Sequence, residues 1–233
     1  VLEIEAHAIL GLRDRLDDSF LRSVELIKNS TGKVVVTGIG KSGQVARKIA
    51  STFSSTGTQA VYLHPAESSH GDLGLIAPND IVLAISYAGQ SPELSPILSY
   101  VARKNIPLIA MTGNRVSLLA QKANFVLDIY VEKEACPLGL APTASSTASL
   151  ALGDALCMSV LEAKGFRAED FAEYHPGGGI GLRLAKVKDL MHTGQALPVV
   201  EQAASMKKVI SLMSAGEVRG AVGVLDEKDQ LIG

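Results

Sequence analysis

The chain has 233 residues, of which 47% are hydrophobic, and its formal net charge is −2. A charge this close to zero gives no electrostatic reason to bind nucleic acid or an anionic membrane, and we expect neither partner. No apolar run approaches the roughly 20 residues that a membrane span needs. Residues 1–29 are charged throughout, which predicts no signal peptide. The presence of only two cysteines suits a reducing compartment. We therefore expect a cytoplasmic protein.

A helix is predicted over residues 1–30, because apolar side chains recur there every three or four positions with charges between them. These positions are Ile9, Leu12, Leu16, Phe20, Val24 and Ile27. A leading helix of this kind can pack on its own domain or on a second subunit, and the pattern leaves both alternatives open.

The next stretch predicts a buried strand, a glycine turn and a helix. Val34–Val36 is a β-branched run without alternation, which is typical of a parallel strand buried on both faces. Gly38, Gly40 and Gly43 allow a sharp turn and a close approach of the backbone to a ligand. A helical pattern follows from Ser42 onward. The helix N-terminus favours phosphate, with Gly40, Lys41 and Ser42 beside it, although a tight turn with a solvated Lys41 is the alternative.

This stretch can be compared with two known nucleotide-binding motifs. The glycines match G-x-G-x-x-G, but the next strand, residues 60–63, ends in His64-Pro65 and not in the acidic residue that a dinucleotide site uses. A P-loop requires glycine at position 35, where Val35 stands. The sequence thus disfavours the first motif and excludes the second.

Further strands are predicted over residues 81–86, 107–111 and 125–129, and helices over 92–104 and 116–122. Strands that alternate with helices predict an α/β fold, here a five-stranded parallel sheet sandwiched by helices. Such sheets bind ligands at the carboxyl ends of their strands. We therefore look for site residues directly after each strand.

Polar loops follow three of these strands. The loop after residues 60–63 contains His64, Glu67, His70 and Asp72, which could hold zinc or contact substrate without a metal. The loop from Ser86 to Ser91, with Glu93 after it, could bind phosphate through hydroxyl and N–H groups or be a plain capped loop.

Residues 130–147 form a long loop, a feature that is usually functional, and place Glu134 there as a candidate base. The hydroxyls of residues 143–147 lead into a predicted buried helix over 148–164. His175 stands at a glycine-rich corner, where it could be structural or catalytic. Cys136 and Cys157 offer no metal-binding spacing and would ordinarily pack as small apolar side chains.

The composition changes near residue 185. A basic connector, residues 185–194, precedes a predicted strand over 197–200, a helix over 206–214 and strands over 220–225 and 231–232. We interpret this part as the beginning of a second domain.

With these stretches identified, the sequence resembles the arabinose-5-phosphate isomerases, which have a sugar isomerase (SIS) domain with a flavodoxin-like fold, followed by two CBS modules. The matching stretches are Gly38–Gly43, His64-Pro65, His70–Gly74, Ser86–Glu93, Lys133–Thr143 and His175–Gly178. The resemblance implies a SIS domain over residues 1–185 and a partial first CBS module over 186–233.

The resemblance also implies the interconversion of D-ribulose 5-phosphate and D-arabinose 5-phosphate for Kdo, lipopolysaccharide or capsule synthesis. It places catalytic residues at Lys41, Glu93, Glu134 and His175, substrate contacts at Gly40, Ser42, His70, Ser86, Ser91 and Thr143, and a zinc-binding histidine at His64. No cofactor is required, and a zinc ion at His64 would be inhibitory or structural. Homodimers or homotetramers are implied, with His175 reaching a neighbouring subunit. Tyr87-Ala88 and Gln90 depart from the family's common residues and leave the sugar contacts open.

The chemistry needs a base to move a proton between C1 and C2 through an enediol, a cation near the oxyanion and a group that opens the sugar ring. Glu134 is the predicted base, because the first helical turn should depress the pKa of Glu93. The alternatives are a sugar-phosphate-sensing regulator without catalysis and an isomerase of heptose or hexulose phosphates. The near-neutral charge favours the enzyme.

Overall fold

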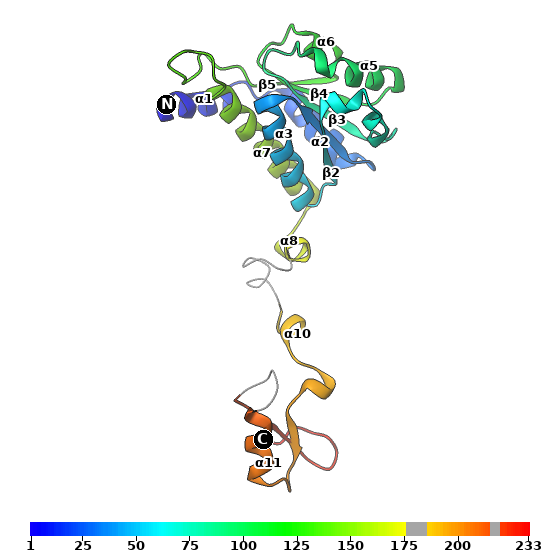
Figure 1. Ribbon diagram of the computed structural model, residues 1–233, viewed down its shortest axis with the longest axis vertical. Helices are drawn as coiled ribbons and strands as arrows, with labels where there is room; N and C mark the ends of the chain where they lie inside the picture. Colours follow the sequence, from blue (N-terminus) through cyan, green and yellow to red (C-terminus); the bar gives the residue numbers. More distant parts are fainter. Residues whose placement is uncertain (176–185, 215–219) are drawn as a thin grey trace. The chain divides into compact units, whose positions relative to one another are not determined.

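The computed structural model describes residues 1–175, 186–214 and 220–233, and the chain divides into two compact units, residues 1–178 and 179–233 (Figure 1). The first unit contains the predicted sheet. The boundary predicted at residues 185 and 186 lies at the edge of a stretch outside the described residues.

The first unit is built on a five-stranded sheet in the order β2-β1-β3-β4-β5, in which every neighbouring pair is parallel. The strands are β1 (Val34–Gly38), β2 (Ala60–Leu63), β3 (Ile81–Ile85), β4 (Leu108–Thr112) and β5 (Phe125–Asp128). The three central strands are buried along their whole length, as expected of apolar runs without alternation. The predicted fold class is confirmed for this unit.

Helices cover both faces of the sheet because successive strand residues point to opposite sides. Val34 and Val36 join the core under α2 (Asp18–Asn29), α3 (Gly40–Ser55) and α7 (Ala144–Lys164), whereas Val35 joins the core under α5 (Ser95–Lys104) and α6 (Leu118–Lys122). Figure 1 shows α3 and α7 on one side and α5 and α6 on the other.

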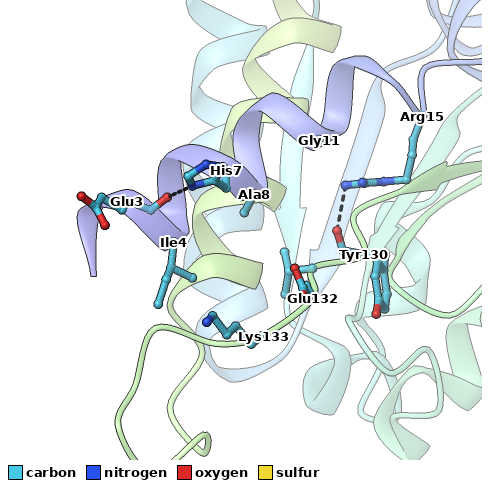
Figure 2. A pocket seen from close by; sticks show the side chains of 10 residues that line it. Glu3, Ile4, His7, Ala8, Gly11, Arg15, Tyr130, Glu132 and Lys133 are labelled. Atoms are coloured by element: carbon cyan, nitrogen blue, oxygen red, sulfur yellow. Dashed lines mark hydrogen bonds between the residues drawn. The ribbon is translucent and has the colours of Figure 1, made fainter.

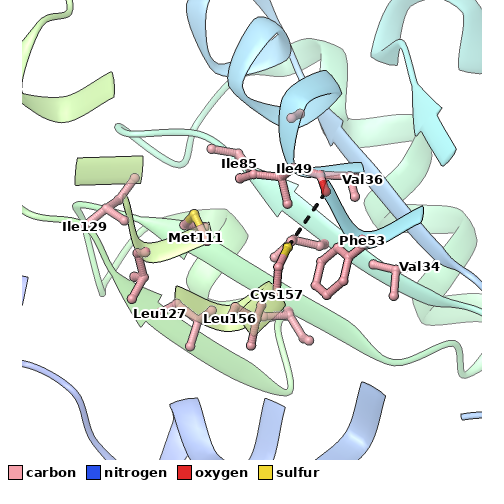
Figure 3. Packing of buried hydrophobic residues seen from close by; sticks show 14 of the residues in the cluster. Val34, Val36, Ile49, Phe53, Ile85, Met111, Leu127, Ile129, Leu156 and Cys157 are labelled. Carbon is pink, nitrogen blue, oxygen red and sulfur yellow. Dashed lines mark hydrogen bonds between the residues drawn. The ribbon is translucent and has the colours of Figure 1, made fainter. Parts of the chain in front are cut away.

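The larger core cluster lies where α3 and α7 meet the sheet (Figure 3). Phe53 and Ile49 of α3 are fully buried, and the Cys157 thiol of α7 lies 3.9 Å from the Ile49 carbonyl oxygen. Burial raises the pKa of Cys157 to about 12. Cys157 is therefore an inert packing residue, as expected.

The N-terminal segment differs from the prediction of one helix. The structure has two helices, α1 (Leu2–Arg13) and α2, because the Asp17 carboxylate accepts the Ser19 N–H at 2.9 Å and caps a new helix start. Both helices pack against α7 of the same unit. Ile9 and Leu16, which were expected on the buried face, remain 41% and 47% exposed.

Several other helix boundaries shift for local reasons. The helix predicted over residues 92–104 is a 3-10 turn, η2 (Pro92–Leu94), followed by α5. α6 begins at Leu118 because the Ser117 hydroxyl caps it. α7 begins four residues before the predicted position 148, and the loop after β2 contains two short helices, α4 (Pro65–Ser68) and η1 (Asp72–Leu75).

Among the described residues, one helix, α7, is long and apolar enough to cross a membrane by length and composition. Half of its apolar window is buried, and α1, α2 and α3 all pack against it. Its apolar character is accounted for by its place at the centre of the helical layer.

The described part of the second unit contains two short parallel strands, and the longest of its helices lies between them in sequence. Its elements are α10 (Val187–Leu190), η3 (Gly194–Ala196), β6 (Val199–Glu201), α11 (Met206–Ser214) and β7 (Gly223–Leu225). The predicted helix over 206–214 is confirmed. The strand predicted over 231–232 is only an isolated bridge between Leu225 and Leu231, because the Asp226 carboxylate closes a tight turn by accepting the Lys228 and Gln230 N–H groups.

Candidate active site

The strand order places the candidate site at a switch point of the sheet. β2 pairs with one side of β1 and β3 with the other, so the chain leaves β1 and β3 in opposite directions. In open parallel sheets, ligands bind in the crevice outside the carboxyl ends of such strands. The segments that follow β1, β2, β3 and β5, including the first residues of α3 and η2, begin at this carboxyl edge and contain every predicted site residue except His175.

The glycine turn joins β1 directly to α3. Gly40 has φ of +58°, and a Cβ on Gly43 would lie 2.7 Å from the Gly38 carbonyl oxygen, so a side chain at either position is disfavoured. α3 begins at Gly40, two residues earlier than predicted, and points its first N–H groups at the carboxyl edge. Lys41 is exposed there and Ser42 is half-buried. The turn has the geometry of an anion site.

Tyr62 supports this turn and was not identified from the sequence. Its hydroxyl donates to the Gly38 carbonyl oxygen at 2.8 Å, and the Arg47 guanidinium lies 4.1 Å from the centre of its ring. A tyrosine in an apolar strand is common, so its position carries no signal until the fold brings β2 beside β1.

The loop after β3 is organised by a serine pair. The Ser86 and Ser91 hydroxyl oxygens are 3.0 Å apart, and Ser86 Oγ also accepts the Gly89 N–H at 3.1 Å. Ser86 is only 5% exposed. Ser86 and Ser91 therefore contact each other within the loop, Ser91 also stands at the start of η2, and their expected contacts with substrate stay predictions. Glu93 follows in η2 and is exposed.

Glu134 is held at the beginning of α7. Its Oε2 atom accepts hydrogen bonds from the Thr143 N–H at 2.7 Å, the Thr143 hydroxyl at 3.0 Å and the Ser145 N–H at 3.3 Å. The Thr143 hydroxyl oxygen also accepts the Ala135 N–H at 2.8 Å. These contacts close the loop from 134 to 143 at its base and engage the Thr143 hydroxyl, whose expected contact with substrate stays a prediction.

Burial alone raises the pKa of the Glu134 carboxyl, but the hydrogen bonds from Ser145 and Thr143 outweigh it and lower the pKa below its ordinary value. The sequence argument expected such a shift at Glu93, because Glu93 follows a helix cap. That reasoning missed the position of Glu134, whose carboxylate meets the N-terminus of α7 only after the loop folds back.

The loop after β2 contains His64 and His70. His64 caps α4 by accepting the Ala66 N–H on Nδ1 at 3.2 Å, and α4 packs against η2, which carries Glu93. His70 is exposed. The two histidines and Glu93 therefore belong to neighbouring segments of the same edge.

The described residues do not fit a zinc site. Within them, no group of three His, Cys, Asp or Glu side chains could hold a metal ion. The capping bond also needs the lone pair on Nδ1 of His64, which places the proton of the neutral ring on Nε2, where a metal would have to bind.

His175 is not brought to this edge within one chain. α7 begins beside Glu134 and ends at the opposite edge of the sheet, where the Lys164 ammonium donates to the Thr58 hydroxyl at 3.0 Å just before β2. His175 lies further on, after α8 (Ala168–Tyr174), where its ring stacks on Phe171 with 4.0 Å between centroids. The glycines that follow it, residues 177–179, lie outside the described residues.

A cavity of about 690 Å³ lies between α1 and the segment after β5 (Figure 2). No predicted site residue lines it. Its walls are formed by Glu3, Ile4, His7, Ala8, Gly11, Arg15, Tyr130, Val131, Glu132 and Lys133. The cavity adjoins the start of the Glu134 loop on the side of α1.

Comparison with known proteins agrees with this architecture. Residues 26–159 match the SIS domain family model, and the chain belongs to this family. A Pseudomonas aeruginosa relative, arabinose 5-phosphate isomerase KdsD, is 48% identical over 231 residues, which cover 99% of this chain and 71% of that protein. An E. coli CFT073 protein solved in complex with arabinose 5-phosphate has a TM-score of 0.72 and 39% identity, covering 75% of this chain and 93% of that chain.

The KdsD of Salmonella typhi is 47% identical over 211 residues, which cover 90% of this chain and 64% of that protein. The chain thus spans less than two thirds of the length of that relative. The resemblance to this group of SIS-domain proteins is confirmed.

Proposed function

We propose that the chain interconverts D-ribulose 5-phosphate and D-arabinose 5-phosphate. The observation that carries the proposal is the 48% identity to a KdsD protein over 231 residues, a span that covers 99% of this chain. The convergence of the glycine turn, the Ser86–Ser91 loop and the Glu134 loop at one sheet edge supports it. An intramolecular proton transfer is redox-neutral and needs no nicotinamide. This agrees with the sequence, which lacks the acidic residue that a dinucleotide-binding site uses after its second strand.

The phosphate of the substrate would bind between the glycine turn and the Ser91 end of the β3 loop. Both are starts of helical segments with N–H groups at the carboxyl edge, and Lys41 adds a positive charge. Binding there would place the sugar carbons toward the β5 side of the crevice. Lys41 would also stabilise negative charge that develops on a substrate oxygen in the enediol step.

Glu134 is the base in this proposal. Three hydrogen bonds fix Oε2, so Oε1 is the atom left to take a proton from C1 of the ketose and return it to C2. The lowered pKa keeps the carboxylate ionised at neutral pH, which a base requires, although it also weakens the base. Glu93, exposed in η2 at the same edge, is the competing candidate.

His175 would open the furanose ring of the aldose from a neighbouring subunit. Its place beyond the far end of α7 supports action on another copy, and this arrangement requires a homodimer or homotetramer. Zinc takes part in no step of the proposed reaction.

The second unit is proposed to be part of a regulatory CBS module, and we expect a chain that ends at Leu184 to retain most turnover.

The direct test is turnover of phosphorylated sugars. Purified protein is incubated side by side with five-, six- and seven-carbon ketose phosphates, and the aldose products are separated and quantified. Arabinose 5-phosphate formed from ribulose 5-phosphate, with little turnover of the longer sugars, supports the proposal. Preference for a longer sugar would reassign the substrate, and binding without turnover would indicate a sensor.

We also propose a cytoplasmic location.

A further inference from the structure

Tyr87 connects two loops of the candidate site. It directly follows Ser86, and its main-chain carbonyl oxygen accepts the Gly113 N–H at 3.0 Å and the Thr112 hydroxyl at 3.0 Å. Its ring covers Gly113 so closely that a Cβ there would lie 2.5 Å from a ring carbon. The backbone and ring of Tyr87 are therefore fixed on the β3–β4 side of the edge.

The hydroxyl of Tyr87 reaches the segment after β5. It donates to the Val131 carbonyl oxygen at 3.2 Å and accepts the Val131 N–H at 3.3 Å. Val131 is only 6% exposed, so its peptide groups have little access to water if these bonds are lost. One hydroxyl thus pairs both polar backbone groups of a residue three positions before Glu134.

The same segment is anchored from its other side by Arg15, which lies in the turn just after α1. Arg15 Nη2 donates to the Tyr130 carbonyl oxygen at 2.8 Å, as Figure 2 shows. Tyr130 and Val131 are thus held by two side chains, Arg15 and Tyr87, that are distant from them in sequence. From Glu132 to Pro142, by contrast, most side chains are exposed.

Burial and nearby negative charge both raise the pKa of the Tyr87 hydroxyl. Burial is the largest cause that raises the pKa of Tyr87, and the negative charges of Glu134 and Asp128 raise it further, while the bond to Val131 opposes them. A protonated hydroxyl can donate and accept at once, as both bonds to Val131 require.

We propose that Tyr87 is a positioning residue, which fixes the start of the Glu134 loop relative to the Ser86–Ser91 loop. In this way it determines where the Glu134 carboxylate lies relative to the bound phosphosugar. This inference rests on the proposed function for its catalytic part. Its structural part, the anchoring of residues 130–131, can be measured without substrate.

Tyr87→Phe tests the proposal because it keeps the ring and removes both bonds. We expect kcat to fall roughly tenfold or more, since small displacements of catalytic groups have large effects, with KM within about twofold. Cleavage after Glu132 by endoproteinase Glu-C, followed by mass spectrometry of the native protein, should become several-fold faster. Arg15→Gln, which removes the second anchor, should accelerate the same cleavage.

The matched control is Asn124→Ala. Asn124 Oδ1 accepts the N–H of buried Leu108 at 2.8 Å at the opposite edge of the sheet, so this variant also leaves a backbone N–H unpaired. It should lose thermal stability without changing kcat or cleavage after Glu132.

Unchanged cleavage and kcat in Tyr87→Phe, or changes no larger than those in Asn124→Ala, would overturn the role of Tyr87. A wild-type protein that turns over no ribulose 5-phosphate would instead overturn the proposed function and the catalytic part of this inference together, and the cleavage assay would still decide the anchoring.

Discussion

The Glu134 carboxylate has two oxygens in different situations, since Oε2 accepts every hydrogen bond described for this side chain. Glutamine can keep an oxygen at the Oε2 position, so the loop base should survive a Glu134→Gln change. The substitution thus separates the role in the loop from the role in proton transfer.

We expect Glu134→Gln to reduce kcat by roughly 10²-fold or more, the scale of general-base loss, with little change in substrate binding. Solvent deuterium should stop entering the C1 and C2 positions, which NMR of the recovered sugar phosphates would detect. Glu93→Gln is the matched variant. A loss of exchange in Glu93→Gln alone would assign the base to Glu93.

Asp80 is a buried carboxylate at the opposite edge, where it closes the turn before β3. It accepts the Lys33 ammonium at 2.6 Å, the Lys33 N–H at 2.9 Å and the Ala77 N–H at 2.8 Å. Burial raises the pKa of Asp80, but these bonds together lower it below its ordinary value of 3.8. A lowered folded-state pKa stabilises the protein above the ordinary pKa, and this stabilisation is lost as the pH falls through the folded-state value.

Asp80→Asn should therefore reduce the free energy of unfolding by about 1.5–3 kcal/mol at neutral pH, the scale of hydrogen bonds to a charged group. Urea titrations at several pH values should show that the difference from wild type shrinks below about pH 4. Asp154→Asn removes the exposed pair with Lys48 and should change stability by less than about 1 kcal/mol. A difference for Asp80→Asn that persisted in acid would contradict the explanation.

Among the elements, the glycine turn leaves no room for a side chain at Gly43. A Cβ on Gly43 would lie 2.7 Å from the Gly38 carbonyl oxygen and 2.9 Å from the Tyr62 hydroxyl. The first of these neighbours is backbone, so the turn itself must move. The N-terminus of α3 and Lys41 would move with it.

Gly43→Ala should raise KM for the sugar phosphate roughly tenfold, equivalent to about 1.4 kcal/mol of binding free energy. The rise in Tm that wild type shows with added inorganic phosphate should also be reduced. Gly74→Ala is the control, because nothing lies within 4 Å of the Cβ position there. Unaltered protection of Gly43→Ala by phosphate would place the phosphate elsewhere.

The elements could be predicted from sequence where the pattern was strong and local. The Val34–Val36 run and the glycines after it predicted β1, the turn and α3 within two residues. The break between α1 and α2 was missed because the apolar spacing continues across Asp17. The Asp17 side chain nevertheless caps the start of a new helix, and the apolar spacing does not reveal this. The stretch after β5 was predicted only as a long loop, since Glu134 contacts residues nine and eleven positions further along the chain.

The site could be predicted as a set of loops but not as a set of contacts. Parallel topology alone brings the residues after β1, β2, β3 and β5 to one edge. Whether a side chain there faces substrate or its own loop depends on tertiary packing, and Ser86, Thr143 and His64 all proved to be engaged locally. Tyr87 was noted only as a departure from the family pattern, because nothing in its neighbours indicates Val131.

At the scale of the whole molecule, His175 and Lys41 provide a test of shared sites. Lys41→Ala and His175→Ala should each lose most activity as homomers. Co-expressed with different tags and purified as mixed oligomers, they should regain part of it, because one intact site can form from the Lys41 of one subunit and the His175 of the other. Mixed oligomers as inactive as either parent would show that His175 does not act between subunits.

The length of α7 has a consequence for how turnover responds to the amount of protein. Its 21 residues span about 30 Å and separate the Glu134 end from the segment that leads to His175. If each site borrows a group from another copy, an isolated subunit lacks a complete site, and association becomes part of catalysis by mass action. Activity per subunit would then fall on dilution, and in the dilute limit the rate of a dimeric enzyme would rise with the square of its concentration. Expression level would control such an enzyme more steeply than one whose site is complete within a single chain.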